Sequence, residues 1–257
     1  MITTYWMDSS SLPDLSKDPT EWNACLQRLP RERAEKIRCI RHPDSRKQSL
    51  GAGLLLQEAL DRLAPSAKIS ALPYGKPVCK QAAFNLSHTK DRVILSIWEG
   101  GRLPLEKEDR DYLIGCDIEP VRPCRLHIAQ RFFTESEYRS LEAVKDPRIQ
   151  DEWFCRYWTK KESVIKLTGL GMSLPLHLFD VRGSQVQADP QQVLRWSCQA
   201  SENVQKDKRL EIQKITEILL EKQLFFKEYR LQEYCVTVCS MADCFGPDLQ
   251  RYPLDCS

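Results

Sequence analysis

Residues 115–120 read Gly-Cys-Asp-Ile-Glu-Pro, and they set two carboxylates two positions apart within an apolar stretch. Side chains alternate along a β-strand, so Asp117 and Glu119 are expected on one face of a strand spanning 112–119. An Asp-x-Glu pattern is also common on exposed strands, where it has no special role. The pair therefore needs a third ligand before it indicates a metal site.

Residues 158–166 read Trp-Thr-Lys-Lys-Glu-Ser-Val-Ile-Lys and provide that third carboxylate, Glu162, on a predicted helix. Lys166 follows one turn later, a spacing that also stabilises ordinary exposed helices. Mg²⁺ prefers oxygen ligands and often completes its shell with substrate phosphate. We predict that Glu162 joins Asp117 and Glu119 in a magnesium site of an enzyme that acts on phosphate groups.

The surrounding patterns predict an α+β protein in two parts. The expected strands span 4–7, 83–87, 92–98, 112–119, 224–229 and 234–241. The expected helices span 30–41, 47–63, 125–133, 153–168 and 202–223. Thr134 to Glu137 has the sequence of a capping box. A polar connector at 100–110 separates two apolar strand patterns, so we place the domains at 1–104 and 105–257.

The composition limits which binding partners and which cell compartment we expect. The net charge of +2, from 38 basic and 36 acidic residues, provides no overall field for nucleic acid. No apolar stretch approaches the roughly 20 residues that span a bilayer, so we expect no membrane insertion. Eleven cysteines without a CxxC pair, and no recognisable leader, favour reduced thiols in the cytoplasm. A zinc site at Cys235 and Cys239 is the less favoured alternative to buried structural thiols.

The first part of the chain offers groups that suit a phosphate ligand. Lys76, Ser87 and His88 flank a short connection and could meet there, although each is also ordinary in a turn or at a strand end. A run of basic residues between Arg28 and Lys47 is either a solvated helix face or part of the same anion site. A single phosphorylated ligand fits these groups better than nucleic acid does.

Five motifs in this order resemble the Sfp-type 4′-phosphopantetheinyl transferases, with the similarity running from about 29 to 178. They are Gly-Lys-Pro at 75–77, Phe-Asn-Leu-Ser-His at 84–88, Gly-Cys-Asp-Ile-Glu at 115–119, Arg-Phe-Phe-Thr-Glu-Ser-Glu-Tyr at 131–138 and Trp-Thr-Lys-Lys-Glu-Ser-Val-Ile-Lys at 158–166. The resemblance implies two similar α/β halves that form an intramolecular pseudo-dimer, with coenzyme A between them. It also implies transfer of the 4′-phosphopantetheine arm to a serine of an apo acyl or peptidyl carrier protein, releasing adenosine 3′,5′-bisphosphate.

The resemblance further implies roles for individual residues. Asp117, Glu119 and Glu162 match the magnesium ligands, Glu162 would accept the serine proton, and Lys166 would stabilise or protonate the departing phosphate. The positions that match coenzyme A contacts are Lys76, Ser87, His88, Lys161, Lys36, Arg46 and Lys47. Ile118 stands where some members carry a fourth acidic ligand.

Two segments look longer than the family pattern, the connector at 100–110 and the helix at 202–223, which leaves the carrier preference open. Two other functions compete with this interpretation: a different magnesium phosphotransferase or phosphodiesterase, and a module that binds carrier proteins without modifying them. We expect a monomer, because two halves in one chain make an obligate oligomer unnecessary.

Overall fold

The computed structural model describes residues 1–100 and 107–252, and its first sheet is built mainly from the N-terminal part of the chain. Its strand order is β11 (Phe245–Arg251), β1 (Ile2–Asp8), β5 (Arg92–Trp98) and β4 (Phe84–Thr89). The strands β1, β5 and β4 are antiparallel, whereas β11 lies parallel to β1. The sheet therefore includes a strand from the far end of the chain.

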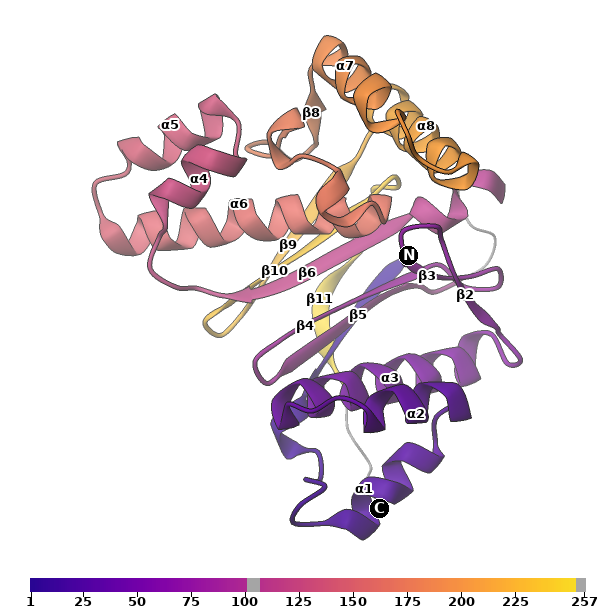
Figure 1. Ribbon diagram of the computed structural model, residues 1–257. Helices are drawn as coiled ribbons and strands as arrows, with labels where there is room; N and C mark the ends of the chain where they lie inside the picture. The colour runs from indigo at the N-terminus through magenta and orange to yellow at the C-terminus, as the bar shows by residue number, and fades with distance from the viewer. Residues whose placement is uncertain (101–106, 253–257) are drawn as a thin grey trace.

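The second sheet has the order β6 (Ile114–Pro120), β10 (Tyr234–Ser240) and β9 (Phe225–Leu231), and both of its pairings are antiparallel. The long helix α6 (Pro147–Thr168) packs on β6 and β10. Figure 1 shows this helix above the second sheet and α3 (Pro43–Leu63) below the first.

The two sheets pack between these two helices. On β5, Val93, Leu95 and Ile97 share a hydrophobic cluster with the α3 side chains, whereas Ile94 joins the cluster of the second sheet. This division follows from the period of two along a strand. The layers therefore run from α3 through the first and second sheets to α6. Buried apolar side chains lie in each interface, and the one between the sheets also holds the buried polar residues Asn85 and Ser87.

Shorter helices and strands surround this four-layer core. The smaller helices are α1 (Pro19–Gln27), α2 (Arg31–Arg38), α4 (Leu126–Phe132), α5 (Glu135–Ala143), α7 (Pro190–Ala200) and α8 (Lys206–Glu221). The short strands are β2 (Ile69–Ala71), β3 (Pro77–Cys79), β7 (Phe179–Asp180) and β8 (Gln187–Ala188), with 3₁₀ turns at Ser9–Ser11, Lys107–Tyr112, Gly171–Ser173 and Leu176–Leu178. Seen from above, a group of helices extends to the left of the strands, where Figure 1 places α4, α5 and the start of α6. No helix within the described ranges combines the length and apolarity needed to cross a bilayer.

Most of the predicted elements are confirmed. All six strands form, the pairing of β9 with β10 is antiparallel as expected, and the capping box at Thr134 is complete. The sequence patterns missed α1, α7 and β11. The expected boundary between 104 and 105 falls within 101–106, outside the described residues, so the division into 1–104 and 105–257 stays a prediction.

Candidate active site

A very close contact between β6 and α6 shapes the centre of the site. A Cβ atom built on Gly115 would lie 2.0 Å from the carbonyl oxygen of Ser163 and 2.4 Å from the amide nitrogen of Leu167. Only glycine allows two backbones to approach this closely. Because Gly115, Asp117 and Glu119 share one face of β6, both carboxylates lie on the α6 side of the strand.

The carboxylate of Asp117 is the most tightly held of the three. Its Oδ1 accepts hydrogen bonds from Ser87 Oγ at 2.9 Å and from Lys166 Nζ at 2.6 Å. Lys166 Nζ also donates to Ser87 Oγ at 2.5 Å, which closes a three-membered network. Asp117 Oδ2 is buried and has no hydrogen-bond partner. A buried carboxylate oxygen without a donor is costly unless something else binds it.

Strand β4 brings hydroxyl and amide groups from the first sheet to this site. Asn85, Ser87 and Thr89 alternate along β4, and each forms a hydrogen bond with a residue of β6. The Asn85 Oδ1 accepts from the backbone N–H of Cys116 at 3.0 Å, and Thr89 Oγ1 donates to Glu119 Oε2 at 3.3 Å. The site therefore lies where β4 and β6 meet, between the two sheets.

The charges of the three carboxylates are only partly balanced. Burial, followed by the charge of Asp117, raises the pKa of Glu162 to about 7. Burial and then Asp117 also raise the pKa of Glu119. Burial lowers the pKa of Lys166, but Asp117 and other neighbouring groups outweigh it and raise the pKa overall. These directions show three acidic groups close enough to repel one another beside a single lysine.

The acidic groups raise the question of a divalent cation. Within the described part of the chain, no group of three or more His, Cys, Asp or Glu side chains is arranged so that it could hold a metal ion. The unpartnered Asp117 Oδ2 and the mutual repulsion of the carboxylates are nevertheless what a hard cation would relieve. Binding of Mg²⁺ by Asp117, Glu119 and Glu162 stays a prediction.

Basic groups line the site on the side of the first sheet. The pKa of His88 is lowered by burial first, and then by the charges of Lys166 and Arg33. Arg33, on α2, donates to the carbonyl and hydroxyl oxygens of Ser49, each at 3.2 Å. The sequence analysis included Arg33 only as one member of the basic run and gave no role to Thr89, which directly follows the motif at 84–88.

Two of the predicted coenzyme A contacts instead have their side chains in the interior. Lys161 is fully buried, forms an ion pair with Glu137 at 2.8 Å and donates to the carbonyl oxygen of Leu176 at 2.8 Å. Lys76 is also buried and donates to the carbonyl oxygens of Leu167, at 2.7 Å, and Asp111. These partners give both ammonium groups a role in packing, and neither contacts the Asp117 network.

The other basic residues that we expected to contact coenzyme A lie on α2 and α3. Lys36 is exposed and pairs with Glu32 one turn earlier at 2.7 Å. Arg46 lies over the Trp22 ring, 5.7 Å from its centroid, and Lys47 is 3.6 Å from Asp14. The structure thus brings Ser87 and Lys166 into contact with Asp117, whereas His88 is exposed on the opposite face of β4. Lys36, Arg46 and Lys47 have other partners.

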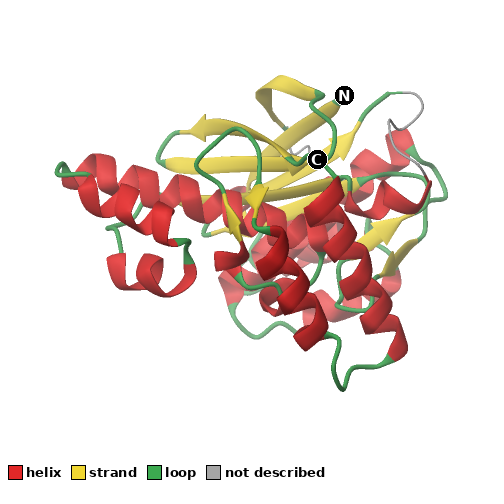
Figure 2. Cartoon of the chain, turned by 90° about the horizontal axis from the view of Figure 1, so that it is seen from above, coloured by secondary structure: helices red, strands yellow, loops and turns green. Residues whose placement is uncertain are grey.

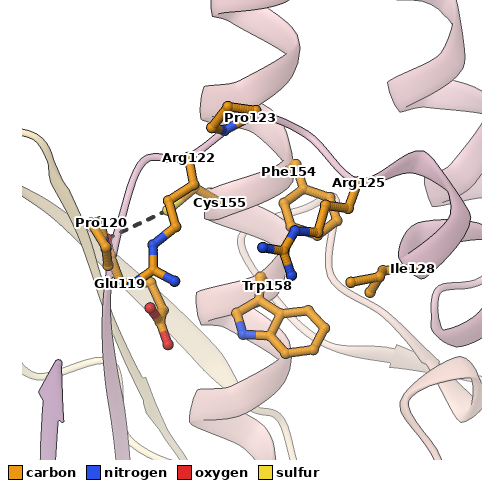
Figure 3. Close-up of a pocket in the computed structure, with 9 residues that line it drawn as sticks. All are labelled: Glu119, Pro120, Arg122, Pro123, Arg125, Ile128, Phe154, Cys155 and Trp158. Atoms are coloured by element: carbon orange, nitrogen blue, oxygen red, sulfur yellow. Dashed lines mark hydrogen bonds between the residues drawn. The ribbon is translucent and has the colours of Figure 1, made fainter. Parts of the chain in front are cut away.

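A surface pocket of about 210 Å³ opens beside Glu119. It is lined by Glu119, Pro120, Arg122, Pro123, Arg125, Ile128, Phe154, Cys155 and Trp158. Figure 3 shows two guanidinium groups, the Trp158 indole and the Phe154 ring around it, with Glu119 at its edge. A pocket that combines aromatic surface with cations, next to a carboxylate group, suits part of a polar organic substrate.

Comparison with known proteins shows which class of protein this part of the chain resembles. Residues 113–239, which include β6, α6 and β10, match the family model of the 4′-phosphopantetheinyl transferase superfamily. About half of the chain therefore matches that superfamily, and the resemblance found in the motifs is confirmed.

Three relatives show how far the similarity reaches. The 4′-phosphopantetheinyl transferase Sfp of Bacillus subtilis (strain 168) is 35% identical over 158 residues, 59% of this chain and 65% of that protein. The 4′-phosphopantetheinyl transferase psf-1 of Bacillus pumilus is 39% identical over 124 residues, 47% of this chain and 46% of the relative. The L-aminoadipate-semialdehyde dehydrogenase-phosphopantetheinyl transferase of Mus musculus is 25% identical over 197 residues, 69% of this chain and 60% of the relative. The chain thus spans less than two thirds of the length of each.

Proposed function

We propose that this chain transfers the 4′-phosphopantetheine arm of coenzyme A to a serine of an apo acyl or peptidyl carrier protein. The observation that carries the proposal is the network of Asp117, Ser87 and Lys166 beside Glu119 and Glu162, within a segment of the matched superfamily. Adenosine 3′,5′-bisphosphate is the second product. The names of the relatives support the same activity.

The three carboxylates would hold Mg²⁺, which, when bound, offsets negative charge on the pyrophosphate of coenzyme A. Lys166 donates to Asp117 and Ser87, so its ammonium group lies where it can bind a phosphate oxygen. Ser87 and His88 provide further donors, and Arg33 adds positive charge on the same side. Together these groups orient the phosphorus atom for attack.

Glu162 accepts the proton of the carrier serine in the proposed reaction. The serine oxygen then forms a bond to the phosphorus that carries pantetheine, while the bond from that phosphorus to the bridging pyrophosphate oxygen breaks. Lys166 stabilises the phosphate that departs with the adenosine. Positioning and charge stabilisation account for most of the catalysis in such a transfer.

The remaining basic residues that we expected to contact coenzyme A fall into two groups. Lys36, Arg46 and Lys47 would reach coenzyme A only after leaving the partners they have here. Lys76 and Lys161 support the site indirectly, because their buried ammonium groups tie its helix and strand to neighbouring backbone.

We further propose that the two sheets and their long helices correspond as halves of an intramolecular pseudo-dimer, which acts as a monomer. Each half has antiparallel strands covered by one helix of more than twenty residues, α3 or α6. The eleven cysteines without a CxxC pair support action in the reducing cytoplasm.

The test is to incubate the protein with coenzyme A, Mg²⁺ and a panel of apo carrier domains, and to measure the intact mass of each carrier. We expect one phosphopantetheine arm to be added, no addition with EDTA, and recovery when Mg²⁺ is restored. Binding of coenzyme A without addition to any carrier would favour a binding module. Hydrolysis of coenzyme A without transfer would favour another phosphoesterase chemistry.

The matched variants are Glu162→Gln and Glu152→Gln, which make the same isosteric change on the same helix. Glu152 is half-exposed and pairs with Arg230 at 3.3 Å, away from the carboxylate group. Glu162→Gln should slow transfer by roughly 10²-fold or more, as expected for loss of a general base. Glu152→Gln should keep the rate of the natural protein. A folded Glu162→Gln variant with undiminished transfer would remove Glu162 from the mechanism.

A further inference from the structure

Two cysteines meet next to the site although they are far apart in the sequence. Cys155 lies on α6 seven residues before Glu162, and Cys235 lies directly opposite Glu119 in the pairing of β10 with β6. Both residues are buried. Seven residues are close to two helical turns, so Cys155 and Glu162 share the face of α6 that packs on the sheet.

The neighbouring threonine pair shows why the two thiols meet. The hydroxyl oxygens of Thr159, on α6, and Thr237, on β10, are 2.9 Å apart. Cys155 lies four residues before Thr159, about 6 Å along the helix, and Cys235 lies two residues before Thr237, about 6.7 Å along the strand. The two steps match in length, so the side chains of Cys155 and Cys235 lie next to each other between the helix and the sheet.

The Cys155 thiol is also connected to the site and to the surface. Its Sγ donates to the backbone carbonyl oxygen of Glu119 at 3.5 Å, the contact drawn as a dashed line in Figure 3. Cys155 is 4% exposed and is one of the residues that line the pocket beside Glu119. Cys235 lies on the other side, where Arg230 Nη1 is 3.8 Å from its Sγ.

We propose that Cys155 and Cys235 form a redox-sensitive pair, which a low-molecular-weight disulfide oxidises to an internal disulfide that disables the adjacent site. The effect on transfer rests on the proposed function, whereas formation of the disulfide does not. Cys155 is the thiol that the oxidant meets first, because it lines the pocket. Cys235 is the resolving thiol, with the guanidinium group of Arg230 beside its sulfur.

The oxidation proceeds in two exchange steps. The Cys155 sulfur, having given up its proton to solvent, attacks one sulfur of the small disulfide, which leaves a mixed disulfide and releases one small thiol. The Cys235 sulfur then loses its proton and attacks Cys155 Sγ, which forms the internal disulfide and releases the second small thiol. The two cysteines lose two electrons in total, and the small disulfide gains both.

The disulfide would alter the site through Glu119. The oxidised Cys155 has no S–H group to donate to the Glu119 carbonyl oxygen, and the new bond draws α6 toward β10 at the position opposite Glu119. Displacing a catalytic or ligand group by about 1 Å can cost roughly 10²-fold in rate. We therefore expect oxidation to slow transfer at least tenfold and a reductant to restore it.

The test treats the full chain with glutathione disulfide and maps the disulfides by peptide mass under non-reducing conditions. The exposed Cys39, Cys198 and Cys244 are first replaced by serine, so that surface thiols do not dominate. We expect a peptide linked through Cys155 and Cys235, reversed by dithiothreitol. Cys235→Ala should stop at a mixed disulfide on Cys155. Cys239→Ala, which removes another buried thiol of β10, should leave the linked peptide unchanged.

Activity and Mg²⁺ affinity are then compared in the oxidised and reduced protein. Slower transfer and weaker Mg²⁺ binding after oxidation, both reversed by dithiothreitol, would support the inference. It is overturned if no linked peptide forms, or if a quantitatively oxidised protein transfers and binds Mg²⁺ as the reduced protein does. Lack of transfer by the reduced protein would instead count against the proposed function, and the linked peptide would still be read by mass.

Discussion

Replacing Gly115 by alanine should force α6 away from β6 and disrupt the site from a position that no ligand touches. The added Cβ would lie 2.0 Å from the Ser163 carbonyl oxygen, 2.4 Å from the Leu167 amide nitrogen and 2.7 Å from Leu167 Cβ. Ordinary contact begins near 3.4 Å, so the two backbones must separate by about 1.4 Å at this point. The flexible end of a side chain could move away from the new atom. Here the nearest atoms belong to the backbone of α6, which cannot move without straining the hydrogen bonds of the helix.

The separation should lower stability and activity together. Overpacking in a core typically costs 1–3 kcal/mol, and contact with backbone places this substitution at about 3 kcal/mol or above. For a chain of this size the loss corresponds to a fall in Tm of roughly 6–12 °C. Glu162 lies beside Ser163, so its carboxylate moves relative to Asp117, and transfer should fall on the order of 10²-fold even where the variant is folded.

Urea unfolding, followed by circular dichroism, measures the stability, and the carrier-mass assay at a temperature well below the Tm measures the rate. Gly183→Ala is the matched control, because its Cβ would meet only Gln185 atoms at 3.7 and 3.8 Å. That variant should stay within about 0.5 kcal/mol of the natural protein. If Gly115→Ala unfolds at the same urea concentration as Gly183→Ala and transfers at the same rate, the account of the helix contact is wrong.

Three further predictions concern the groups that support the site. Lys161→Met should cost about 3–5 kcal/mol in urea unfolding, because it leaves Glu137 as an unpaired buried charge; the double variant with Glu137→Gln should cost less than the two single variants added together. Burial lowers the pKa of Lys76 from 10.5 to about 7. Between these values the unfolded chain holds a proton that the folded chain lacks, so the free energy of unfolding should rise with pH. Lys76→Met should flatten that rise, which urea titrations at pH 7, 8 and 9 would reveal. Thr134→Ala removes the acceptor for the Glu137 N–H and should cost about 1 kcal/mol by thermal unfolding, with Ser at 134 restoring most of it.

Local patterns were sufficient to predict the acidic part of the site. The period of two on β6 placed Asp117 and Glu119 on one face, and the helical spacing on α6 placed Glu162 and Lys166 one turn apart. Both inferences need only the geometry of a single element. They did not predict that Lys166 would donate to Asp117, because that contact depends on how closely Gly115 lets the helix approach the strand.

Lys161 shows why a charged residue next to a catalytic one can have a different role. It follows Lys160 and precedes Glu162, but one residue along a helix is a rotation of about 100°, so adjacent side chains face different surroundings. The surroundings of Lys161 are Glu137, the Phe179 ring and the backbone of 176–179. The sequence did contain one signal, because Glu137 is the capping-box residue of α5, but its burial appears only in the fold.

Strand β11 was missed for a related reason. Its first residues, Phe245-Gly246-Pro247-Asp248, include a proline that lacks a backbone donor and a glycine that weakens a strand, so the local pattern does not predict one. Such a segment is tolerated at the edge of a sheet, where one side needs no partner. Its partner is β1, from the opposite end of the chain, and only the assembled sheet shows that this edge is available.

The position of β11 also bears on how the site is held together. Ser87 and Thr89 belong to the first sheet, whereas Asp117 and Glu119 belong to the second, so each contact between them depends on the spacing of the two sheets. That spacing is fixed at several places: Asn85 bonds β6 directly, and the chain leaving the second sheet returns as β11 to pair with β1. Moving the sheets apart would therefore break backbone pairing as well as side-chain contacts. The contacts that hold the sheets at this spacing form when the chain folds. The hydroxyl and carboxylate groups therefore already face one another before a ligand binds, as preorganised charge stabilisation requires.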